Sequence, residues 1–186
     1  TLEGQILFQL EEPAQAALEK ALGLWRRLLG PEHPNTLAVM GWLGILLNAQ
    51  GDHEAARRVE EQALEVSRRT LGPEHPNTLT AMSNLARTLR SQGDLEGARK
   101  LLEKALETSL GSVGPEDPDT IATMSSLVFV TNRQGRHAEA IALAREVLDL
   151  RRRTLGEENY RTITSLGNLA TVLFEVGSLE QAGIHF

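Results

Sequence analysis

The sequence predicts an all-α fold, an α-solenoid of antiparallel helix hairpins, from three observations. An eight-residue segment, LGPEHPNT, occurs twice without change, at residues 29–36 and 71–78. Looser copies begin at residues 113 and 155, so each copy starts 42 residues after the one before, without insertion or deletion. Between the copies, apolar residues recur at helical spacing. A fixed period of roughly 20–50 residues is typical of stacked units that bury their apolar faces only against neighbours.

Each repeat is expected to contain two helices, and the second repeat shows this most clearly. Its first apolar face consists of Leu79, Met82, Leu85, Ala86 and Leu89. Gly93 and Asp94 then interrupt the pattern, because glycine permits a turn and aspartate can cap a following helix. A second apolar face consists of Ala98, Leu101, Leu102, Ala105 and Leu106. One repeat is therefore predicted to be a helix hairpin.

The prolines of the repeated segment predict where the first helix of each hairpin begins. Pro34, Pro76 and Pro118 suit the first turn of a helix, where the missing N–H is no loss. The residue before each proline is disfavoured in the α-helical region. The preceding helix should therefore end before the segment, and a new helix should begin within it.

We expect a single repeat array over residues 1–186. It would comprise a partial repeat at 1–28, complete repeats at 29–70, 71–112 and 113–154, and a truncated repeat at 155–186. Pro13 predicts the start of a second helix, which would make residues 2–9 the stub of a separate first helix. The last helix would run from Leu179 to Phe186. The chain opens at Thr1 without an initiator methionine or a leader, so we expect a fragment of a larger protein. Because both ends lack a polar capping helix, we expect this fragment to associate end to end through uncovered apolar faces.

Composition argues against several classes of protein. The chain has no cysteine, which excludes disulfides, thiolate metal sites and thiol nucleophiles. Its formal net charge is −6, which argues against a nucleic-acid partner. No apolar run is long enough to span a membrane. We therefore expect a cytoplasmic protein with no nucleic-acid or membrane partner.

The motif content does not favour an enzyme. Neither a glycine-rich phosphate loop nor a nucleophile elbow occurs. His33 and His75 are equivalent loop residues in successive repeats, and packed helices alone are about 8–10 Å apart, too far for one shared metal ion. Glu32 and Glu74 are separated in the same way, and no base or nucleophile accompanies them. We expect no catalytic residue, metal or cofactor.

The pattern Met82-x-x-Leu85-Ala86-x-x-Leu89, followed by Gly93 and by Ala98-x-x-x-Leu102-x-x-Ala105, resembles the tetratricopeptide repeat (TPR). The 42-residue period, the LGPEHPNT segment and Asn84-Leu85-Ala86 resemble the kinesin light chain type. The resemblance covers essentially the whole chain. Trp42 departs from the pattern where other repeats have asparagine, Glu60 replaces a large apolar residue, and the fourth repeat lacks the His-Pro pair. The resemblance implies a right-handed superhelix with a concave groove, lined by first helices, that holds a partner peptide.

The resemblance also implies which positions of the first helices face the groove. The expected peptide-binding residues are Trp42, Ile45, Asn48, Ser83, Asn84, Arg87, Arg90, Phe129, Asn132, Arg133, Asn168 and Thr171. Asparagine can pair with both groups of a peptide bond, and arginine can pair with acidic side chains. Trp42 and Phe129 would be apolar anchors. The alternative is an ordinary solvated face, with Trp42 packed against a neighbouring helix.

These observations favour a non-catalytic scaffold that binds a protein or peptide, with acidic residues or an extended segment as its expected features. A rival function is a regulatory or sensor segment of a larger signalling enzyme, an NTPase or protease, whose catalytic domain lies outside this chain. A third function is assembly by stacking of repeats into filaments. The first two would use the same groove, so the motifs of this chain do not separate them.

Overall fold

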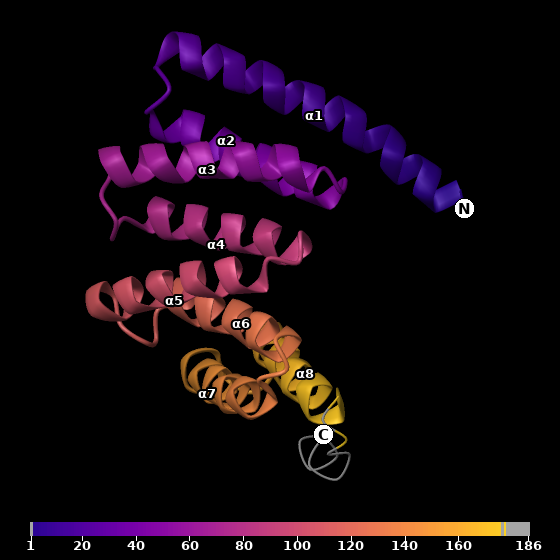
Figure 1. Ribbon diagram of the computed structural model, residues 1–186, viewed down its shortest axis with the longest axis vertical. Coiled ribbons are helices and arrows are strands. Elements are labelled where there is room, and N and C mark those ends of the chain that lie inside the picture. The colour runs from indigo at the N-terminus through magenta and orange to yellow at the C-terminus, as the bar shows by residue number, and fades with distance from the viewer. Residues whose placement is uncertain (1, 176, 178–186) are drawn as a thin grey trace. The chain divides into compact units, whose positions relative to one another are not determined.

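The computed structural model describes the backbone of residues 2–175 and 177, and the side chains of residues 14–175 and 177. The described residues form α-helices joined by short turns, without a strand. The helices are α1 (Leu2–Leu28), α2 (Pro34–Ala49), α3 (His53–Thr70), α4 (Pro76–Ser91), α5 (Leu95–Ser112), α6 (Pro118–Arg133), α7 (His137–Leu155) and α8 (Tyr160–Glu175) (Figure 1). They divide into two compact units, Thr1–Asp94 with α1–α4 and Leu95–Phe186 with α5–α8. The all-α class is confirmed.

The repeated segment forms the start of a first helix, as predicted. Pro34, Pro76 and Pro118 are the first residues of α2, α4 and α6. The residue before each proline is the N-cap, and its side chain accepts a hydrogen bond from the exposed backbone of the first turn. His33 Nδ1 accepts from the Asn35 N–H at 3.1 Å, and His75 makes the same bond. The histidines of the segment therefore cap the N-termini of first helices, a role that is local and structural.

The turn inside each hairpin depends on glycine. Gly51, between α2 and α3, has φ 85°, and Gly135, between α6 and α7, has φ 75°. Both values lie in the left-handed region that glycine enters at little cost. The short turns bring α2 against α3 and α6 against α7 as antiparallel pairs (Figure 1).

The predicted break near Pro13 is wrong, because α1 is one helix from Leu2 to Leu28. One period before Gly51 the chain has Gln9. Without a residue that readily adopts positive φ, the chain lacks the hairpin turn and the helix continues past the proline. The expected last helix, from Leu179 to Phe186, lies outside the described residues.

Each unit has its own apolar core. In the first unit, Met40, Leu43 and Leu47 of α2 pack with Ala56 and Ala63 of α3. In the second unit the core joins three helices through Met124, Val128, Ala144, Val147, Leu148, Leu169 and Leu173. Small alanines on the second helices allow close approach of the leucine-rich first helices. This packing supplies the main stabilising contribution, since buried apolar area is the dominant favourable term in folding.

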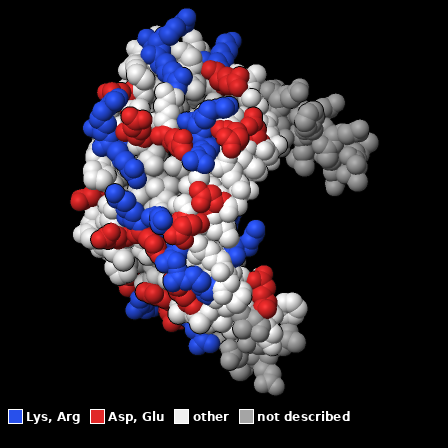
Figure 2. All heavy atoms as spheres, in the orientation of Figure 1, with Lys and Arg blue, Asp and Glu red and all other residues white. Residues whose placement is uncertain are grey.

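Acidic and basic side chains are interspersed on the face shown in Figure 2. Several form ion pairs one helical turn apart, such as Arg57 with Glu61 at 2.8 Å and Arg99 with Glu103 at 2.7 Å. Exposed pairs of this kind contribute about 0.3–0.5 kcal/mol each. These ion pairs lie on the outer surface of the helices and do not determine the fold.

The threonine that ends the repeated segment ties the loop to the helix. Thr36, Thr78 and Thr162 each donate a hydrogen bond of 2.8 Å to the carbonyl oxygen of the glycine six residues earlier. All three side chains are buried. Thr120 occupies the same place in the third repeat, but its buried hydroxyl has no hydrogen-bond partner among the described residues. The equivalent threonines therefore differ in what they contribute.

Replacing Thr78 with valine should lower the free energy of unfolding by about 1 kcal/mol, because the half-buried Gly72 carbonyl loses its donor while the side-chain shape is kept. Thr120→Val is the matched control and should be neutral or slightly stabilising, since its hydroxyl is already unpaired. Denaturant unfolding followed by circular dichroism measures both. Equal losses in the two variants would contradict this assignment.

Candidate functional site

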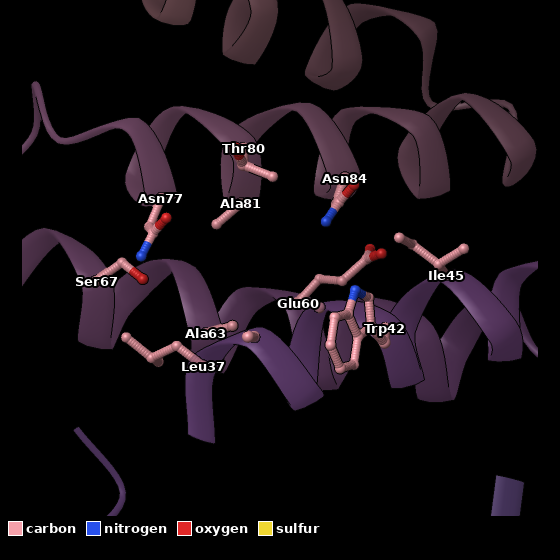
Figure 3. Close-up of a pocket in the computed structure, with 12 residues that line it drawn as sticks. Leu37, Trp42, Ile45, Glu60, Ala63, Ser67, Asn77, Thr80, Ala81 and Asn84 are labelled. Atoms are coloured by element: carbon pink, nitrogen blue, oxygen red, sulfur yellow. The ribbon is translucent and has the colours of Figure 1, made fainter. Parts of the chain in front are cut away.

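A cavity of about 220 Å³ lies in the first unit, where α2, α3 and α4 meet. Figure 3 shows the side chains that surround it. They are Leu37, Ala38, Gly41, Trp42, Ile45, Glu60, Ala63, Ser67, Asn77, Thr80, Ala81 and Asn84. The lining therefore combines an apolar surface with amide and hydroxyl groups and one carboxyl group, a combination typical of small binding sites.

Three of the predicted groove residues line this cavity together. Trp42 and Ile45 come from α2 and Asn84 comes from α4. The Trp42 side chain is 60% exposed and Ile45 is 37% exposed, so neither is a core residue. Trp42 therefore lies largely exposed beside the cavity, and its role as a peptide anchor stays a prediction. Gly41 leaves its side of the cavity open, with only Asn84 Nδ2 within 3.6 Å of the position of an added Cβ.

Glu60 is the unusual residue of the cavity. It is 1% exposed, and neither carboxyl oxygen has a hydrogen-bond partner among the described residues. Its side chain extends from α3 toward the space between Asn84 and Ile45 (Figure 3). The equivalent residues in the next two repeats are the buried Leu102 and Ala144. An apolar position of the repeat thus carries a buried carboxyl group.

Gly44 provides the space that Glu60 occupies. A Cβ at residue 44 would lie 2.6 Å from Glu60 Cγ and 2.8 Å from Oε1. Glycine is therefore required here by a neighbouring side chain, although Gly44 lies within a helix where glycine is unfavourable. The pair Gly44–Glu60 corresponds to Ala86–Leu102 in the following repeat.

Burial raises the pKa of the Glu60 carboxyl above its ordinary value of 4.5. The neighbouring Thr88 hydroxyl and the positive charge of Arg87 oppose this increase in part, although the contact with Thr88 falls short of hydrogen-bond geometry. Arg87 is half-buried and points its Nη2 at Asn84 Oδ1, 3.4 Å away. The cavity therefore holds a carboxyl group that is poorly compensated by the chain itself.

Two predicted groove residues are used within the fold. Asn48 Oδ1 lies 2.7 Å from His53 Nδ1, and Asn132 Oδ1 lies 2.8 Å from His137 Nδ1. Asn132 also donates to Glu175. The two histidine contacts link the end of a first helix to the first residue of the second helix, whereas the Glu175 contact joins α6 to α8. The two amides therefore support the hairpin turns, and neither lines the cavity.

The other predicted residues are distributed over both units. In the first unit, Ser83 and Arg90 are half-buried on α4 and outside the cavity lining. In the second unit, Phe129 and Arg133 are exposed on α6, and Thr171 is exposed on α8, where it donates to the Gly167 carbonyl at 2.9 Å. Asn168 is half-buried beside a small space of about 10 Å³ between α6, α7 and α8.

The sequence analysis noted Glu60 as a departure and did not place it in the site. The available signal was a charged residue at a position where the next repeat has leucine, opposite a glycine where that repeat has alanine. Among the described residues, no group of three or more His, Asp or Glu side chains could hold a metal ion. None of the described helices is long and apolar enough to cross a membrane.

Antiparallel hairpins of constant length, with a cavity on the side of their first helices, define a helical repeat protein of the solenoid class. A model of the tetratricopeptide repeat matches residues 4–69, 41–110 and 114–186. The chain therefore belongs to the tetratricopeptide repeat family. A comparison with curated protein sequences gives no match.

Solved structures support the kinesin-light-chain-like type. The "kinesin light chain nearly identical TPR-like repeats" of Podosopora anserina are 26% identical, with a TM-score of 0.78 over 94% of this chain and 83% of that one. BtubC (BKLC) from P. vanneervenii is 20% identical, with a TM-score of 0.80 over 94% of this chain and 70% of that one, and shares the fold. MamA from Desulfovibrio magneticus RS-1 is 18% identical, with a TM-score of 0.62 over 96% and 90%, and shares the fold.

Proposed function

We propose that the chain is a non-catalytic scaffold that binds an extended peptide segment of a partner protein on the first-helix face of its repeats. The observation that carries the proposal is the cavity at Trp42, Ile45 and Asn84, where exposed apolar side chains lie beside the amide group of Asn84. An extended peptide offers both a side chain for the apolar surface and backbone groups for the amide.

Several features support a peptide over a small metabolite. Trp42 lines the cavity and is 60% exposed, so its ring can cover a side chain that enters. Arg87 and Arg90 lie along α4 next to the cavity, and acidic side chains of a peptide would pair with them. In the second unit, Phe129, Arg133, Asn168 and Thr171 belong to the corresponding face, where we propose further contacts.

Screening the full chain against an array of acidic and neutral peptides tests the proposal. Trp42→Ala should weaken the selected peptides by about tenfold or more, because truncating a central aromatic anchor typically costs this much. Tyr160→Ala removes another exposed aromatic residue, outside the cavity, and is the matched control. Affinity for acidic peptides should also fall as the salt concentration rises. Peptides that bind equally well to the Trp42 variant and to the wild type would contradict the proposal.

We propose that the array is one segment of a larger protein, and that its end faces can associate with other copies. A regulatory segment of a signalling enzyme would use the same first-helix face, so the peptide screen serves both functions. Light scattering at increasing concentration of the full chain tests self-association independently of peptide binding.

A further inference from the structure

The second unit contains a site equivalent to the cavity, two repeats further along the chain. The residues around its small space that correspond to Gly41, Glu60, Ala63, Ala81 and Asn84 are Ser125, Ala144, Val147, Ser165 and Asn168. One is a cavity of about 220 Å³ and the other a space of about 10 Å³. The same place in the fold is open in one unit and filled in the other.

An arginine of the chain fills the second site. Arg151 extends from α7, and its Nη1 donates to Ser165 Oγ at 2.6 Å and to the Arg161 carbonyl at 3.0 Å. Its Nη2 donates to Ser125 Oγ at 3.1 Å. The guanidinium group therefore lies between the equivalents of Gly41 and Ala81. This arrangement shows that the space between a first helix, a second helix and the next first helix accommodates a guanidinium group.

The first unit has the complementary composition. Ser67 replaces Arg151, so α3 sends no cation into the space, while Glu60 replaces Ala144 and adds a carboxyl group. This carboxyl is 1% exposed and lacks a hydrogen-bond partner among the described residues. The site in the second unit thus contains the guanidinium group of Arg151 and no carboxylate in its lining. The cavity in the first unit contains the carboxyl group of Glu60 and no guanidinium group.

Among the described residues, Arg87 is the cation whose charge lowers the pKa of Glu60. Its side chain does not occupy the cavity. It comes from α4, is directed to Asn84 Oδ1, and does not belong to the cavity lining. Apart from Glu60, no titratable side chain of α2, α3 or α4 lines the cavity. A cation that entered would therefore meet Glu60 without displacing a partner from it.

We propose that this cavity binds an arginine side chain of the partner peptide, with the guanidinium group against Glu60 and the Trp42 ring at the entrance. The inference rests on the proposed peptide-binding function and identifies the residue that the peptide supplies. Arginine fits better than other side chains, because its planar group donates to carboxylates in pairs and stacks on aromatic rings. The Thr80 hydroxyl oxygen offers a further acceptor.

A small probe tests the cavity separately from peptide binding. N-acetyl-arginine methylamide is titrated into the full chain while the NMR signals of the Trp42 indole and of the Gly41 and Gly44 amides are followed. We expect saturable shifts at these groups. The citrulline analogue has the same shape without the charge, and its affinity should be lower by about tenfold or more. Equal binding of the citrulline analogue, or of the lysine analogue, would overturn the assignment of a guanidinium site.

Two variants connect the shifts to the proposed geometry. Glu60→Gln should weaken the arginine probe about tenfold or more, since the charge is removed while the side-chain size is kept. Ser67→Arg should place an internal guanidinium group in the cavity, as Arg151 does in the second unit, so it should abolish probe binding and raise the melting temperature. Ala142→Arg adds the same charge at an exposed position of α7 and should leave probe binding unchanged. Undiminished binding in both cavity variants would overturn the inference.

The pH dependence provides a further check. Burial raises the pKa of Glu60, and the guanidinium group binds the ionised carboxylate, so probe affinity should increase as the pH rises through the raised pKa. An affinity that is the same on both sides of that transition would contradict the role of Glu60.

Failure of this inference and failure of the proposed function give different results. If peptides bind but tolerate the loss of arginine and the Glu60→Gln change, the scaffold function stands and the arginine site is wrong. If the arginine probe binds and no peptide does, the cavity is a cation site and the scaffold function is wrong.

Discussion

Replacing Glu60 with leucine is expected to stabilise the protein at neutral pH by about 1–3 kcal/mol. The wild-type carboxyl is 1% exposed and has no hydrogen-bond partner among the described residues, so its burial is not compensated. Leucine is the residue that the next repeat has at this position, where Leu102 is buried in the same way. The substitution therefore exchanges an unpaired polar group for a side chain that the fold already accommodates.

The gain should depend on pH in a defined direction. Because burial raises the folded-state pKa of Glu60 above the ordinary value of 4.5, the folded protein holds this proton more tightly than the unfolded chain does. The stability that results is fully present below the unfolded-state pKa and is lost as the pH rises through the folded-state pKa. The advantage of the leucine variant should therefore be smallest in acid and largest above the raised pKa.

Denaturant unfolding of both proteins below pH 4.5, the ordinary pKa of the carboxyl group, and at a series of higher pH values measures this difference. The other carboxyl groups cancel in the comparison. Glu60→Gln is the matched control, since it removes the titration and keeps the shape. It should show the same pH trend relative to the wild type with a smaller gain, because the amide is still polar and buried. A leucine variant less stable than the wild type at neutral pH would show that Glu60 is compensated after all.

Gly44→Ala is expected to destabilise the protein by about 1–3 kcal/mol, although alanine favours a helix by about 0.5–1 kcal/mol over glycine. The new Cβ would lie 2.6 Å from Glu60 Cγ, an atom close to the backbone of α3 that cannot move away alone. The overpacking should exceed the gain in helix propensity. Gly41→Ala, in the same helix, meets only Asn84 Nδ2 at 3.6 Å and should be neutral or stabilising.

A double variant separates the clash from other effects of the substitution. Gly44→Ala combined with Glu60→Leu reproduces the Ala86–Leu102 pair of the next repeat. The two changes should be strongly non-additive, because the alanine that clashes with Glu60 fills the space beside a leucine. Thermal and denaturant unfolding of the single and double variants give the coupling. Additive effects, or a stable Gly44→Ala variant, would contradict a direct contact between residues 44 and 60.

The sequence determined the features that depend on local chemistry. The 42-residue period, the helix starts at Pro34, Pro76 and Pro118, and the turns at Gly51 and Gly135 follow from the backbone preferences of these residues. The same reasoning failed at Pro13, because the turn requires a glycine more than it requires a proline, and residue 9 is glutamine. The prediction that Trp42, Ile45 and Asn84 share one face is consistent with the helical period.

Only the tertiary structure decided how side chains from different helices pair. Asn48 and Asn132 have the spacing of groove residues, yet contacts with His53 and His137 engage them in the turns. Glu60 and Gly44 lie on different helices, and Ser67 and Arg151 fill equivalent places with different groups. Helical periodicity assigns a residue to a face, but the neighbour it meets there depends on packing between helices, and that packing decides whether a site is open, charged or filled.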